Sequence, residues 1–243
     1  MAPKAKSVLA LVLAAAGIAL AIVGQAVGWW IISTDVNPWT ITGHEYHFEA
    51  TTSFLPGADY RFWCSVNNTS MPGWGPICPA TQPAGAAGPY VDPIVPQTAT
   101  GALFGFLDLF MWITGLIAAG GVVAGAAHLA LSARRPKTPR NFAWILLLVA
   151  GALALGAPVG VAFAQPAAYV YDHPGGASAV HSFWGSCQSS SDPSVCGINA
   201  TQTWGAGPGW YLSLSAGGLF VVAGVVGKAR IGGSAARQPS KSS

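Results

Sequence analysis

Long apolar runs dominate the hydrophobic pattern of the chain. A helix needs about 20 mainly apolar residues to cross a hydrocarbon core roughly 30 Å thick. Four runs meet that length and carry no Lys or Arg in their interiors. The pattern therefore predicts four transmembrane helices packed as a bundle, at residues 8–32, 101–132, 141–164 and 209–227.

Two long loops and three short polar segments separate these runs. In the first long loop, residues 39–49 alternate aromatic or β-branched side chains with polar ones, which is typical of a half-exposed strand. Residues 51–54 and 60–66 are expected to pair with that strand. The predicted fold is an all-α membrane bundle with a small β-sheet domain built from the two long loops. The loops lie at 33–100 and 165–208, and the short segments at 1–7, 133–140 and 228–243.

Composition and charge agree with a membrane protein. Hydrophobic residues make up 52% of the chain and charged residues 8%, too few for an ordinary soluble domain. Basic residues gather in the short segments, which the positive-inside rule assigns to the cytoplasm. Both termini should then be cytoplasmic and both long loops outside, in a multi-pass protein of the plasma membrane that contacts the lipid bilayer and no nucleic acid. The basic residues of these segments are Lys4, Lys6, Arg134, Arg135, Lys137, Arg140, Lys228, Arg230, Arg237 and Lys241, and only Arg61 lies elsewhere.

The first apolar run also has features of a signal peptide. Lys4 and Lys6 form a basic n-region, and Ala19 to Ala21 resembles a cleavage site with small residues. The apolar stretch continues as far as Ile32, which is longer than a typical signal and favours a membrane span. Cleavage would leave both long loops on the same side.

Four cysteines lie in the long loops, which the charge pattern places in an oxidising compartment. Structural disulfides are therefore expected, and they would stiffen an outer domain that has few apolar residues of its own. Four cysteines allow three pairings, and pairing within each loop is the simplest. The residues are Cys64 and Cys78 in the first loop and Cys187 and Cys196 in the second.

Thiol–disulfide exchange is an alternative use of these cysteines. In plan the chain resembles the bacterial membrane enzymes that reoxidise a periplasmic disulfide catalyst with quinone, which also have four helices and a cysteine pair in each outer loop. Exchange favours a closely spaced pair with a low thiol pKa, and neither pair here has Cys-x-x-Cys spacing. Arg61 lies three residues before Cys64 and is the one basic residue beside a cysteine pair.

Histidines and carboxylates in the outer loops raise a second alternative, a bound metal ion. On a strand, His44 and His47 would point to opposite faces, so a metal site would need ligands from both loops. The remaining candidates are His173 and His181 in the second loop. No cofactor is predicted. Asn67, Asn68 and Asn199 satisfy the N-glycosylation sequon within the same loops.

Tryptophans and glycines suggest contact positions. Outer tryptophans can anchor protein interfaces, because aromatic residues dominate interface energetics. Small residues spaced by four let membrane helices approach closely, and Pro158 is expected to kink the third helix. The interface candidates are Trp39, Trp63, Trp74, Trp184 and Trp204, and the packing candidates are Gly121, Gly125, Gly156 and Gly160.

Four spans and a large first outer loop with an aromatic-Trp-Cys segment resemble the claudin-type tetraspan superfamily. That pattern is Trp29 or Trp30, then Phe62-Trp63-Cys64 and later Cys78. The resemblance implies a first-loop β-sheet above a left-handed helix bundle, and a role in lateral assembly or contact between membranes. We therefore predict a non-enzymatic membrane protein whose outer domain mediates assembly, adhesion or membrane organisation, as a homo-oligomer or as a subunit of a membrane complex.

Overall fold

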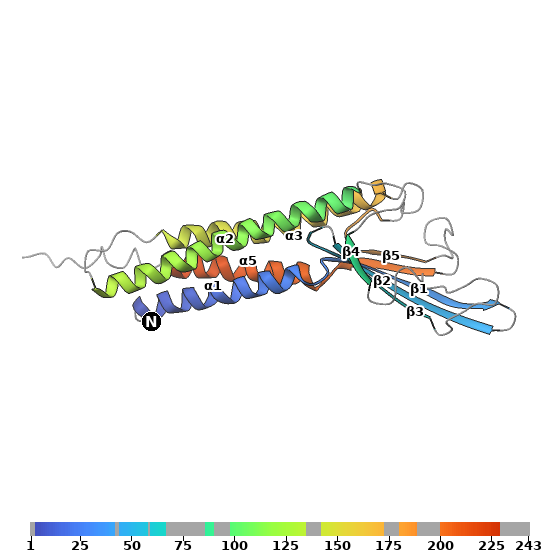
Figure 1. The fold of residues 1–243 in the computed structure, drawn as a ribbon, viewed down its shortest axis with the longest axis horizontal. Helices are drawn as coiled ribbons and strands as arrows, with labels where there is room; N and C mark the ends of the chain where they lie inside the picture. Colours follow the sequence, from blue (N-terminus) through green and yellow to red (C-terminus); the bar gives the residue numbers. More distant parts are fainter. Residues whose placement is uncertain are drawn as a thin grey trace, which may run out of the picture. The chain divides into compact units, whose positions relative to one another are not determined.

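The computed structural model describes residues 3–41, 44–57, 59–66, 86–89, 98–134, 142–172, 180–188 and 200–228. The chain divides into two compact units. The helical unit comprises residues 1–23, 110–157 and 212–243, and the sheet unit comprises residues 24–109 and 158–211. Figure 1 shows the elements of both units, with the helices and strands β1 to β5 labelled.

Within the described residues, four helices are long and apolar enough to cross a membrane. This confirms the predicted set of four membrane helices and identifies the chain as a multi-pass membrane protein. The helices are α1 (Pro3–Gln25), α2 (Ala99–Arg134), α3 (Ala143–Asp172) and α5 (Pro208–Lys228).

Two helices end at different places from the predicted runs. Helix α1 ends at Gln25, although the apolar run continues to residue 32. The indole of Trp29 donates to the carbonyl of Gly24 (2.8 Å), satisfying an acceptor that the helix end leaves unpaired. The chain then enters a strand at Trp30. Helix α3 continues past the predicted boundary at residue 164, through Pro166, to Asp172.

Glycines allow the helices of the helical unit to pack closely. A Cβ on Gly151 would lie 3.0 Å from the backbone nitrogen of Val221, and one on Gly121 would lie 3.0 Å from Leu147 Cδ2. Gly125 makes a similar approach to Leu11. Gly156 and Gly160 instead have open space, so the close approach of α3 to α5 involves Gly151 on α3, together with Gly217 and Gly224 on α5.

Pro158 lies inside α3 and leaves one carbonyl without its usual partner. Proline has no N–H, so residue 158 cannot donate to the carbonyl of Ala154. The hydroxyl of Ser213 on α5 donates to that carbonyl instead (3.1 Å), and Ser213 is fully buried. A side chain from a neighbouring helix thus repairs the backbone hydrogen-bond pattern, as membrane helices require.

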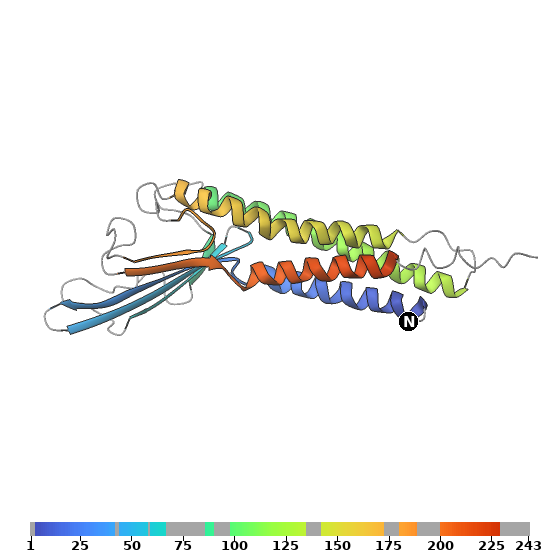
Figure 2. The same ribbon diagram turned by 180° about the vertical axis from the view of Figure 1, so that it is seen from behind.

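Within the described residues, the sheet unit contains an antiparallel sheet of six strands in the order β4-β3-β2-β1-β6-β5. Strand β1 pairs with both β2 and β6, so segments from the two long loops join in a single sheet (Figure 2). The predicted sheet built from both loops is therefore confirmed. The strands are β1 (Trp30–Ile41), β2 (His44–Leu55), β3 (Asp59–Val66), β4 (Ala86–Pro89), β5 (Gly185–Gln188) and β6 (Ala200–Ala206).

The predicted single strand over residues 39–49 is wrong in one respect. Trp39 lies near the end of β1 and pairs with Tyr46 on β2, so this segment folds back on itself as a hairpin. Both arms alternate polar and apolar residues, and the alternation alone does not reveal a reversal. In the sequence, glycine at position 43 is an ordinary turn signal that this prediction did not use.

Candidate functional site

An aromatic cluster in the sheet unit holds the strands against the ends of two helices. The ring of Trp30 contacts Phe54 (5.5 Å), Tyr169 (5.2 Å) and Phe183 (6.5 Å between centroids). Phe54 also stacks on Phe104 at 5.9 Å. We call these five residues the aromatic base. They come from β1, β2, the ends of α2 and α3, and the second loop, so the base ties the sheet to both helix ends.

Two indole N–H groups fasten the second loop to the sheet. Trp30 Nε1 donates to the carbonyl of Phe183 (3.0 Å), and Trp204 Nε1 donates to the carbonyl of Ser182 (2.9 Å). Both tryptophans are buried, so these bonds are shielded from competing water. Two adjacent carbonyls of the segment preceding β5 are thus fixed to β1 and β6.

Asp172 joins the ends of α2 and α3. Its carboxylate oxygens accept hydrogen bonds from the backbone nitrogens of Ala99 (2.6 Å) and Thr100 (2.8 Å). Thr98 Oγ1 accepts a third bond from Gly101. The first N–H groups of a helix lack partners inside the helix and attract negative charge. A carboxylate buried to 2% exposure therefore caps α2 from a distant part of the chain.

The sheet has a polar face beyond the aromatic base. In β1 the side chains of Trp30 and Ile32 are buried, whereas the alternating residues Ser33 and Asp35 are more exposed, as the period of a strand requires. The hydroxyls of Ser33 and Thr51 lie 3.4 Å apart across β1 and β2. We call this surface the polar face; the residues in register on it are Ser33, Asp35, Glu49, Thr51, Thr201 and Thr203.

Two acidic residues lie opposite each other in the strand register of the polar face. Asp35 lies opposite Glu49 on one side and Thr201 on the other, and both acidic side chains are exposed. Like charges directly opposite each other weaken a strand pair. The polar face is therefore hydrophilic and acidic at this position of the register.

The sheet excludes one of the three cysteine pairings. Cys64 on β3 and Cys187 on β5 are four strand spacings apart, about 19 Å along the sheet, whereas disulfide Cα atoms lie within about 7 Å. Cys187 is disulfide-bonded. Its candidate partners are Cys78 and Cys196, which lie outside the described residues. Direct exchange between Cys64 and Cys187 within one molecule is thus ruled out.

The other predicted site residues are dispersed. Trp204 is buried in the sheet unit, and Trp184 is half exposed and touches Phe183 and Trp210 edge to face. His181 is exposed, and the described residues contain no group of three potential metal ligands. Trp39 lies on β1, Trp63 on β3, and His44 and His47 on β2. Predictions outside the described residues concern Trp74, His173, Asn67, Asn68 and Asn199.

Residues that organise the sheet unit were only partly predictable. Trp30 entered the sequence prediction as part of the claudin-type pattern, and no role was predicted for Asp172. The partners of Asp172 lie 72 and 73 residues away, and no local motif signals such a contact. No protein-family model matches the chain, and no curated protein matches it.

Proposed function

We propose that this is a non-enzymatic multi-pass membrane protein whose outer sheet domain mediates lateral assembly, adhesion or membrane organisation, in the manner of claudin-type proteins. The pairing of β1 with β6 carries the proposal, because it builds one extended platform from the two long loops. The buried aromatic base supports the platform on one side, and the polar face presents exposed groups for contact with a partner.

The pairing of β1 with β6 also supports the proposed topology. The two loops are separated in sequence by α2 and α3, and they can share a sheet when both helices cross the membrane. Ten of the 11 basic residues lie in the short polar segments of the sequence, and under the positive-inside rule this supports a sheet on the outside and both termini in the cytoplasm. Lys228 lies 5.1 Å from the ring of Trp144, a pairing suited to the inner headgroup region.

Disulfides and glycans are further parts of the proposal. The bonded state of Cys187 supports an oxidising location for the sheet. Pairing within each loop, Cys64 with Cys78 and Cys187 with Cys196, would stiffen the platform by restricting the unfolded chain. Glycans on the outer sequons would agree with a plasma-membrane protein exposed to the secretory pathway.

Site-specific photocrosslinking from the polar face in native membranes tests the proposed function. A benzophenone amino acid replaces Thr203, which is exposed, or Thr51 in the same face. We expect discrete protein adducts: an adduct of two copies identifies lateral or adhesive self-assembly, and an adduct with another protein identifies a membrane complex. The matched control replaces Leu116, an exposed residue of α2 in the predicted lipid region. Absence of protein adducts from both polar-face positions would contradict the proposal.

A further inference from the structure

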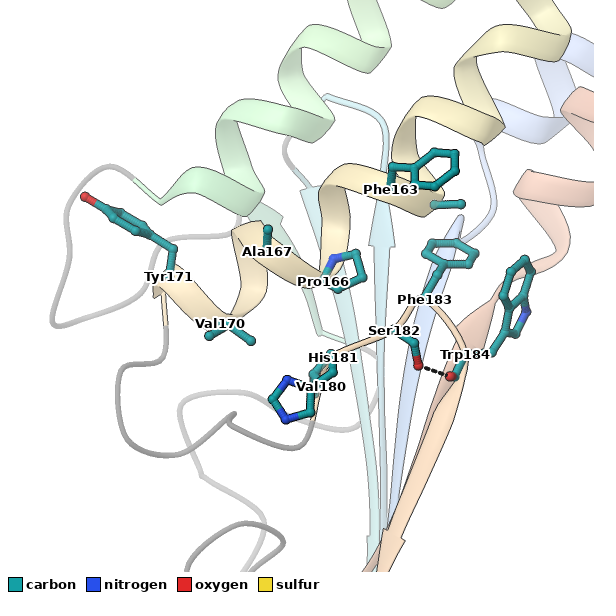
Figure 3. Close-up of a pocket in the computed structure, with 11 residues that line it drawn as sticks. Phe163, Pro166, Ala167, Val170, Tyr171, Val180, His181, Ser182, Phe183 and Trp184 are labelled. Atoms are coloured by element: carbon teal, nitrogen blue, oxygen red, sulfur yellow. Dashed lines mark hydrogen bonds between the residues drawn. The ribbon is translucent and has the colours of Figure 1, made fainter.

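An apolar groove of about 800 Å³ runs between the end of α3 and the segment that precedes β5. Figure 3 shows Phe163, Pro166, Ala167 and Val170 on α3, with Phe183 and Trp184 on the neighbouring segment. All of these residues belong to the sheet unit. The groove exists because small or compact side chains at residues 162, 166 and 167 lie between large aromatic ones.

Apolar surface in this groove is extensive and accessible. Phe163 is 82% exposed and Tyr171 72%, and both lie on the last turns of α3. A volume of about 800 Å³ lies within the range of pockets that bind small molecules, and such pockets have mainly apolar linings. The lining offers little hydrogen-bonding capacity, because the hydroxyl of Ser182 already donates to the carbonyl of Trp184.

The groove lies along the last turns of α3, a candidate membrane span of 30 residues. At 1.5 Å per residue such a helix is longer than a hydrocarbon core of roughly 30 Å, so its last turns reach the boundary between hydrocarbon and headgroups. The walls of the groove therefore continue the surface that α3 presents to lipid. Tyr171, His181 and Trp184 combine an apolar body with a polar tip, as residues at the headgroup boundary do. The acyl chain of a lipid entering from the bilayer would contact the apolar walls, while the glycerol group of that lipid remained near these polar tips.

We propose that this groove holds an acyl chain of a membrane phospholipid, as a selective site beyond the shell of lipid that surrounds any membrane helix. The bound chain fills the space between α3 and residues 180–184 and completes the packing under the second loop. The site depends on the membrane location of α3 and not on the proposed partner of the polar face.

Photolabelling with a phosphatidylcholine that carries a diazirine in mid-chain tests this site in phosphatidylcholine vesicles. Ala167→Trp fills the groove, and Ala164→Trp is the matched control, since Ala164 is exposed on the same helix but does not line the groove. We expect labelling of residues 162–184 in the unaltered protein. Ala167→Trp should reduce it about tenfold, equivalent to about 1.4 kcal/mol of binding free energy, and Ala164→Trp should leave it unchanged.

Equal labelling in all three proteins would overturn the proposal, because it would indicate unselective contact with bulk lipid. A second measurement covers the event that Ala167→Trp does not fold. A benzophenone amino acid at Ala167 should form an adduct with phospholipid. Instead, an adduct with a second copy of the chain or with another protein would show that the groove is a protein interface.

Discussion

Individual side chains stabilise the ends of the helices. Asp172 lies at the end of α3, yet it satisfies two backbone donors at the start of α2. Trp30 contributes both a ring to the aromatic base and an indole donor to the second loop. Each of these side chains therefore links segments that are distant in sequence, and its replacement should affect more than its own element.

Asp172→Asn should destabilise the folded protein. Asparagine retains one acceptor oxygen, but its amide group would face the second backbone N–H, and the negative charge at the start of α2 would be lost. Hydrogen bonds to charged groups contribute about 1.5–3 kcal/mol, so we expect a loss of unfolding free energy in that range. Tryptophan fluorescence during unfolding by sodium dodecyl sulfate in mixed micelles measures it.

Tyr171→Phe is the matched control for this substitution. Tyr171 is the adjacent residue and is 72% exposed, so removal of its hydroxyl should change the unfolding free energy little. Similar losses for the two variants would mean that the Asp172 carboxylate does not stabilise the start of α2.

At this scale the sequence predicted residue types better than contacts. The aromatic-rich loops were evident, and Trp204 was selected as an interface anchor, but it is buried and bonded to Ser182. The contact between Trp30 and Phe183 joins residues 153 positions apart. Local periodicity carries no information about such pairings, because they depend on how the two loops meet in the sheet.

At the scale of elements, the four apolar helices were predictable, since length and hydropathy alone define them. The faces through which these helices contact one another were harder to predict. Gly121 and Gly125 lie at close approaches, whereas Gly156 and Gly160 face open space. Chains rich in alanine and glycine contain many residue pairs with this spacing, so spacing does not identify the face that packs.

Gly151→Ala should weaken the packing of α3 against α5. The new methyl group would lie 2.7 Å from Val221 Cγ2 and 3.0 Å from the backbone nitrogen of Val221, so a backbone must shift. Such overpacking typically costs about 1–3 kcal/mol, and the same unfolding assay measures it.

Gly156→Ala gives the comparison on the same helix. Its methyl group would meet nothing within 4 Å, and alanine favours helix over glycine by about 1 kcal/mol. We therefore expect equal or greater stability for this variant. If Gly151→Ala were as stable as Gly156→Ala, α3 and α5 would not make the close contact described here.

At the scale of the whole molecule, the central claim is that the two long loops form one sheet on the outer side of a four-helix membrane protein. Strands β1 and β6 can pair on one side of a membrane because an even number of membrane helices, α2 and α3, lies between them in the sequence. The sequence predicted the number of spans and a sheet built from both loops, but it located no individual strand in the second loop. Strand β5 has four residues and β6 has seven, so each provides little periodic signal.

A sided crosslinking measurement tests this claim most directly. Ser33 on β1 and Thr203 on β6 are directly paired, and side chains in such pairs lie about 5 Å apart. With both residues changed to cysteine, a short membrane-impermeant bis-methanethiosulfonate reagent added outside sealed cells should react with both thiols, release two methanesulfinates and join the two strands. Neither single variant should give that link. Failure of the double variant to link, or linkage that requires the reagent inside the cell, would contradict the account.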